Sequence, residues 1–76
     1  MQFNISNEDK RSIIEGNVAA AERILYSELI HQGVDPEEFN ESFFDENKSP
    51  EDLSKFSRLK DVYDNYIKVQ EMLNNI

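Results

Sequence analysis

The pair Glu28 and His31 has the spacing in this sequence that is most typical of metal chemistry. On a helix, a Glu-x-x-His motif presents both side chains on one face, as in carboxylate-bridged di-iron bundles. The chain has a single histidine, however, and it lies two residues before Gly33, where a helix is expected to end. A histidine in that place is explained without metal, because a protonated imidazole interacts favourably with the helix dipole. We therefore predict no metal and no cofactor at this pair.

Nucleophilic or phosphate-transfer chemistry has little support. The chain has no cysteine and only two glycines, and it contains neither a Gly-x-Ser-x-Gly motif nor a glycine-rich phosphate loop. Tyr26, Tyr63 and Tyr66, with lysines nearby, could stack on an anionic nucleotide. They lie on or beside apolar rows, so they are more typical of a core edge from which lysines extend into solvent. The sequence predicts a protein that is not an enzyme.

Residues 34–52, called the acidic segment below, carry most of the net charge. They hold eight acids and one base, a net charge of −7 out of −8 for the whole chain. The simplest interpretation is a solvated helix with acids placed for capping and solubility. The alternative is a row of carboxylates that imitates nucleic-acid phosphates and blocks a basic groove. The residues expected to contact a partner are Glu37, Glu38, Phe39, Glu41, Phe43, Asp45 and Glu46.

A calcium loop in the acidic segment is excluded, because the stretch 35–40 lacks the glycine and the alternating oxygen ligands of an EF-hand. The net charge also opposes direct binding to nucleic acid or to an anionic membrane. Residues 1–6 have no basic and apolar pattern of a secretory signal, and no apolar run approaches a membrane span. We expect a cytoplasmic protein whose partners are other copies of itself and an unidentified protein of basic character.

The first helix is expected from Asn7 to Gly33. Ser6 is a capping residue, two acids follow it in the first turn, and Gly33 suits a helix terminus. Apolar residues recur at steps of three and four along this stretch, with a second row on the flank. Gly16 lies between them, which is explained either by close approach of another helix or by simple tolerance.

Two more helix starts are visible. The first, Asp35-Pro36, predicts a short helix from Pro36 to Asp45. The second, Ser49-Pro50, predicts a helix that continues to the C-terminus, because no later glycine or proline interrupts it. Its apolar positions form a wide heptad stripe.

The expected fold is all-α and comprises a single domain, residues 1–76. It consists of a helical hairpin of two long helices with the short acidic helix between them. Both stripes are wider than one hairpin can cover, so we expect a helical-bundle homodimer or a larger oligomer. The residues expected at the oligomer interface are Ile14, Val18, Leu25, Leu29, Leu59, Tyr63, Tyr66 and Leu73.

The leading hypothesis is a non-enzymatic interaction or regulatory protein that acts as a homo-oligomer. The alternative is the acidic inhibitor that mimics phosphates. In size, acidity and richness in Asn, Ile, Glu and Lys, the chain is similar to many short accessory proteins of phages or low-GC bacteria, which adds some support to an inhibitor or adaptor.

Overall fold

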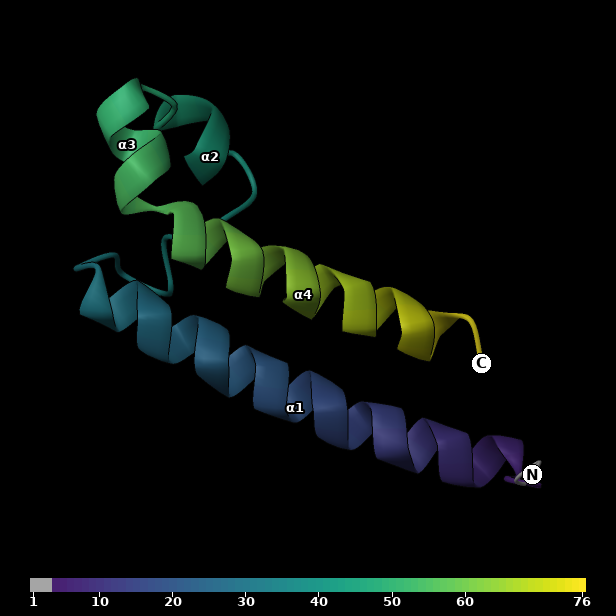
Figure 1. The fold of residues 1–76 in the computed structure, drawn as a ribbon. Helices are drawn as coiled ribbons and strands as arrows, with labels where there is room; N and C mark the ends of the chain where they lie inside the picture. Colours follow the sequence, from purple (N-terminus) through teal and green to yellow (C-terminus); the bar gives the residue numbers. More distant parts are fainter. Residues whose placement is uncertain (1–3) are drawn as a thin grey trace.

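The computed structural model describes residues 4–76, so the first half of the stretch considered above as a targeting signal lies outside the described residues. Four helices follow one another: α1 (Asn7–His31), α2 (Phe43–Glu46), α3 (Pro50–Lys55) and α4 (Ser57–Asn74). No strand occurs within residues 4–76. The two long helices, α1 and α4, pack as an antiparallel hairpin, and α2 and α3 lie at its closed end (Figure 1). The predicted all-helical hairpin is confirmed.

Helix α1 begins and ends as its sequence predicts. The Ser6 hydroxyl accepts a hydrogen bond from the Asp9 amide at 3.1 Å, which satisfies one free N–H of the first turn. At the other end Gly33 has a φ of +76°, a conformation that costs glycine nothing. Backbone bonds from Gly33 to Ile30 and from Val34 to Leu29 then complete a Schellman motif.

The core is small and lies near the closed end of the hairpin. Leu25 and Leu29 of α1 pack against Leu59 of α4 and Phe56, and all four are buried. Ala21 is the other buried apolar residue. A core this thin is expected for a chain of 76 residues.

A polar clamp joins the two long helices beside this core. Glu28 is 9% exposed, and its carboxylate contacts the Arg58 guanidinium with an O–N distance of 3.3 Å. The Gln32 side chain donates a hydrogen bond to the other oxygen of the same carboxylate at 3.1 Å. Both oxygens of this buried acid are therefore paired, and the ion pair with Arg58 links α1 to α4.

The predicted helix from Pro36 to Asp45 is wrong. Residues 36–38 form a turn, and helix begins only at Phe43. The Asn40 side chain accepts the Ser42 amide at 2.9 Å, a local bond that competes with the helical ladder. On a straight helix Phe44 would point about 140° away from Phe39, whereas here both rings meet, with centroids 5.9 Å apart.

The third predicted helix is also interrupted, because α3 and α4 are separated by Phe56. Phe56 has φ −103° and ψ 16°, and its ring meets the edge of Phe43 at a centroid distance of 5.1 Å. Figure 1 shows α3 turned away from the axis of α4. The bend lets Phe56 enter the core while α3 lies beside the aromatic rings.

Candidate functional site

The acids expected to contact a partner are on the surface. Glu37, Glu38, Glu41, Asp45 and Glu46 are all exposed, and none forms a salt bridge within the part of the chain that the structure describes. The two phenylalanines predicted to contact a partner beside these acids are less exposed. Phe39 and Phe43 are half-buried and pack against the core, so they do not supply the apolar rim that the phosphate-mimic hypothesis assumes. That hypothesis stays a prediction supported by the acids alone.

The Glu28-x-x-His31 pair does not come together as a metal site. Glu28 is engaged by Arg58 and Gln32, whereas His31 is exposed at the end of α1. Among residues 4–76 no group of three or more His, Asp or Glu side chains is placed to hold a metal ion.

The residues predicted at the oligomer interface form the contact between the chain's own two helices. Leu25, Leu29 and Leu59 are buried in the core. The other five, which follow the same helical rows, are half-buried: Ile14, Val18, Tyr63, Tyr66 and Leu73. A second copy could not reach the three buried leucines while the hairpin is folded. The five half-buried residues keep part of their surface exposed, so the predicted interface stays a prediction.

A further set of apolar residues lies on the side of the hairpin marked by the Glu28–Arg58 ion pair. Ile24 is one helical turn before Glu28, and Val62 is one turn after Arg58, so both lie on the side of the ion pair. Further apolar residues follow at intervals of three, four and seven on each helix. We call this surface the apolar face; it consists of Ile13, Ala20 and Ile24 of α1 with Val62, Val69, Met72 and Ile76 of α4 and its C-terminal end.

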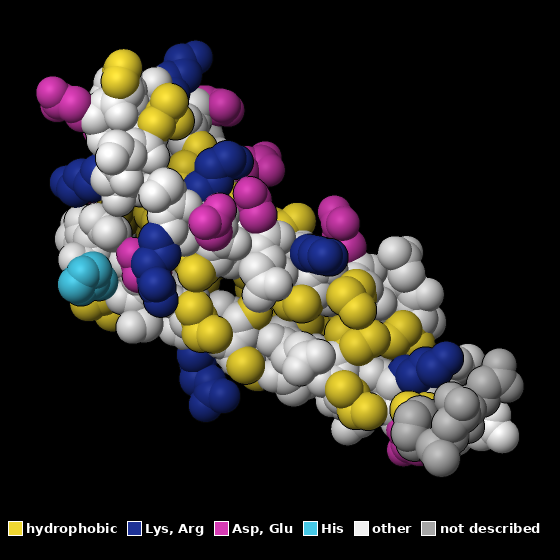
Figure 2. Space-filling view, in the orientation of Figure 1, with side chains coloured by type: hydrophobic (Ala, Val, Ile, Leu, Met, Phe, Trp, Pro, Cys, Tyr) yellow, Lys and Arg dark blue, Asp and Glu magenta, His cyan; other side chains and the backbone are white. Residues whose placement is uncertain are grey.

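The apolar face is partly open to solvent. Ile13 is 56% exposed, Ile24 is 52% exposed and Met72 is 47% exposed. In Figure 2 hydrophobic side chains form a yellow band along the seam between the two long helices. The polar positions within the face, at 17, 27, 58 and 65, are Asn, Ser, Arg and Asn. Glu28 is the acid on these rows, and it is 9% exposed and paired with Arg58.

Gly16 does not mark a close approach within the chain. A Cβ atom placed on it would meet nothing within 4 Å, and the residue is exposed. This finding rules out close approach of the chain's own helices at Gly16 and does not test the approach of a second copy.

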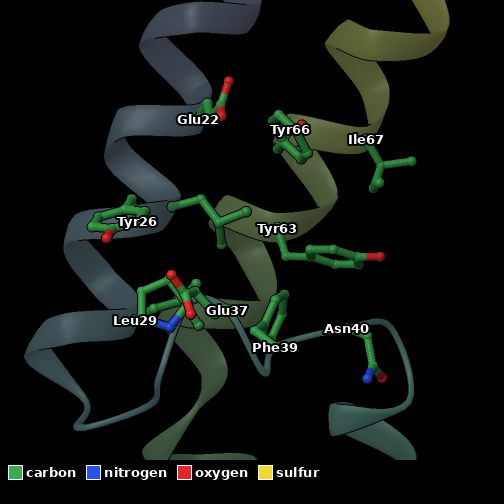
Figure 3. A pocket seen from close by; sticks show the side chains of 11 residues that line it. Glu22, Tyr26, Leu29, Glu37, Phe39, Asn40, Tyr63, Tyr66 and Ile67 are labelled. Carbon is green, nitrogen blue, oxygen red and sulfur yellow. The ribbon is translucent and has the colours of Figure 1, made fainter.

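The opposite side of the hairpin carries an open hollow of about 460 Å³. Around α1, Tyr26 lies about 160° from Ile24, which places the hollow away from the apolar face. Its floor is apolar and includes Leu25 and Leu29. Four aromatic rings and two carboxylates surround this floor (Figure 3): Tyr26, Phe39, Tyr63, Tyr66, Glu22 and Glu37.

The tyrosines were predicted as a core edge beside lysines, or as an anion site. The structure places no Lys, Arg or His from residues 4–76 in the lining of the hollow. Within the described residues the hollow therefore offers no basic side chain to an anion. Glu22 is four residues before Tyr26 and was a possible signal in the sequence, but Glu37 reaches the hollow only through the turn after α1.

Comparison of the chain with protein-family models, with curated protein sequences and with solved structures finds no match. None of the helices within residues 4–76 has both the length and the apolar character that crossing a bilayer requires.

Burial raises the pKa of the Tyr63 hydroxyl above its ordinary value of 10.0, and the nearby carboxylates of Glu41 and Asp64 and the hydroxyl of Tyr66 raise it further. The unfolded chain then loses this proton at a lower pH than the folded chain. We expect the free energy of unfolding to fall as pH rises through and above 10. Urea titrations below and above pH 10 measure this fall.

The matched variants are Tyr63→Phe and Tyr26→Phe. In Tyr63→Phe the free energy of unfolding should fall less as pH rises above 10, because the variant lacks the titrating hydroxyl. Tyr26 is 52% exposed, and Tyr26→Phe is the matched control because it removes a tyrosine hydroxyl from the other long helix. An identical alkaline fall in wild type and Tyr63→Phe would contradict the assignment to Tyr63.

Proposed function

We propose that this chain is a non-enzymatic helical interaction protein that self-associates through its apolar face. The single observation that carries the proposal is an exposed apolar surface on both long helices whose acid, Glu28, is buried and paired with Arg58. Large apolar side chains that remain half exposed on one continuous surface are typical of an interface. The lack of cysteine and of a second histidine supports a binding role over nucleophilic catalysis.

The energetics favour a partner for this face. Fully burying an isoleucine contributes about 1.5–3 kcal/mol, so the exposed halves of Ile13 and Ile24 could contribute about 1 kcal/mol each. A two-fold dimer uses every contact twice, because the same surface lies on both sides of the interface. Two hairpins joined in this way form a four-helix bundle, the arrangement in which wide apolar stripes on both helices are covered.

The charge distribution favours a second copy on this face. Two chains that each carry a net charge of −8 repel one another. The acid on the side of the apolar face, Glu28, is paired with Arg58, whereas the acidic segment holds eight acids and one base. The face is therefore the surface on which identical chains meet with the least repulsion. The exposed acids of residues 37–46 remain free in such a dimer to contact a second protein of basic character.

Ile24→Asp tests the proposal against Ile30→Asp. Both isoleucines are on α1 and are similarly exposed, at 52% and 58%, but Ile30 lies about 120° away around the helix. We expect the dissociation constant of the Ile24→Asp dimer to rise by about a hundredfold, because the unpaired charge is buried twice. Ile30→Asp should change it by less than about threefold.

Sedimentation equilibrium measures the association of the three proteins, and circular dichroism reports that each is folded. A wild-type chain that stays monomeric at high concentration would refute self-association. Equal losses in Ile24→Asp and Ile30→Asp would show that the apolar face is not the interface.

A further inference from the structure

The aromatic hollow on the side of the hairpin opposite the apolar face has no role in self-association. It opens between α1, α4 and the turn of residues 36–40, and its volume of about 460 Å³ is within the range of ligand pockets. Figure 3 shows Tyr26 on the α1 side, Tyr63 and Tyr66 on the α4 side, and Phe39 reaching in from the turn. Three separate segments of the chain therefore contribute aromatic rings to one concave surface.

The rings are held in place by contacts within the chain. The Gln70 side chain donates a hydrogen bond to the Tyr66 hydroxyl at 2.8 Å. Phe39 and Tyr63 meet edge to face, with ring centroids 5.4 Å apart. A tyrosine hydroxyl is protonated at neutral pH, and burial raises the pKa of Tyr63 further above its ordinary value. The hollow thus presents fixed and uncharged ring surfaces, which lowers the entropic cost of binding.

The electrostatics of the hollow suit a cation. Glu22 and Glu37 contribute carboxylates to its lining, and neither forms a salt bridge within residues 4–76. Elsewhere the chain's own lysines cover ring faces: Lys55 lies 5.1 Å from the Phe56 centroid, and Lys60 lies 5.4 Å from that of Phe44. The rings of the hollow have no such cation among the described residues, although aromatic faces and carboxylates both attract one.

We propose that the hollow binds the side chain of an arginine from a basic segment of a partner protein. A guanidinium is planar, so it can stack on a tyrosine ring while its N–H groups donate to a carboxylate. Its three-carbon stem suits the apolar floor formed by Leu25 and Leu29. The negative charge of the whole chain adds long-range attraction for a basic segment.

The probe is a short blocked peptide, acetyl-Gly-Arg-Gly-amide, titrated into the full chain and followed by NMR. The control peptide carries citrulline, which has the shape of arginine without its charge. We expect the arginine peptide to shift the ring signals of Tyr26, Tyr63 and Tyr66, and to bind at least about tenfold more tightly than the citrulline peptide. Equal binding of the two peptides would overturn the proposal. A lysine peptide that bound as tightly as the arginine peptide would overturn the choice of arginine.

Two matched double variants separate the hollow from general attraction to an acidic chain. Glu22→Gln with Glu37→Gln removes both carboxylates of the hollow. Glu15→Gln with Glu71→Gln removes the same charge from exposed positions outside it. We expect the first variant to bind the arginine peptide at least about tenfold more weakly than wild type, and the second less than about threefold more weakly.

Equal weakening by both variants would assign the binding to the net charge and overturn the proposal. A Tyr26→Leu variant that bound the peptide as wild type does would also overturn it, because an exposed ring on the rim would then contribute nothing. Sedimentation of the same proteins reports self-association separately, so a failure of this proposal and a failure of the apolar-face proposal are distinguishable.

Discussion

Replacing Leu59 with alanine is expected to lower the free energy of unfolding by about 3–5 kcal/mol. Leu59 is the largest fully buried side chain, with an exposure of 0%, and it packs with Leu25, Leu29 and Phe56. Its truncation removes apolar contact and leaves a cavity at the centre of the core. Because small domains are stabilised by about 5–15 kcal/mol in total, this change removes a large part of the stability.

Leu53→Ala is the matched control for Leu59→Ala. Leu53 is 57% exposed on α3, so the same chemical change should lower the free energy of unfolding by less than about 1 kcal/mol. Urea unfolding followed by circular dichroism gives both values, with all proteins at one concentration because self-association would shift the result. Similar losses for the two variants would contradict the position of the core.

Replacing Phe56 with alanine is expected to lower the free energy of unfolding by a similar amount, about 3–5 kcal/mol. Its ring is 8% exposed and meets the edge of Phe43. The variant should also change the local structure, because Phe56 lies at the bend between α3 and α4 that holds α3 beside the aromatic rings. We therefore expect the NMR signals of Phe43 and Phe44 to move, while those of residues near the open end of the hairpin stay in place.

Phe56→Leu tests whether burial or the aromatic contact matters more. A leucine keeps most of the buried apolar area, so it should restore more than half of the stability lost in Phe56→Ala. The remainder would measure the edge-to-face contact, which contributes about 0.5–1.5 kcal/mol. If Phe56→Ala unfolds at the same urea concentration as wild type, the bend at Phe56 does not depend on this ring.

The local signals in the sequence were sufficient for the helix ends. The hydroxyls of Ser6 and Ser49 each accept a hydrogen bond from the backbone amide three residues later, and Gly33 terminates α1. These features act over a few residues, so the residue types and their spacing are enough to predict them. Two other boundaries were wrong, one beside the local bond of Asn40 to Ser42 and one where Phe56 packs against distant core residues. Asn40 and Phe56 interrupt expected helices, and both interruptions bring phenylalanine rings together.

For the candidate surfaces too, some features follow from the sequence and others depend on tertiary packing. The sequence by itself determined an all-helical hairpin, the position of the negative charge and the presence of two apolar rows on each long helix. Only the tertiary structure decided that the row through Leu25 and Leu59 is covered by the chain's own second helix, whereas the row through Ile24 and Val62 is left open. Helical periodicity shows which residues share a row, but it is the same for a covered and an uncovered row. The hollow depends on tertiary structure for a related reason, since Glu22, Phe39 and Tyr63 come together only when the turn after α1 folds back over α4.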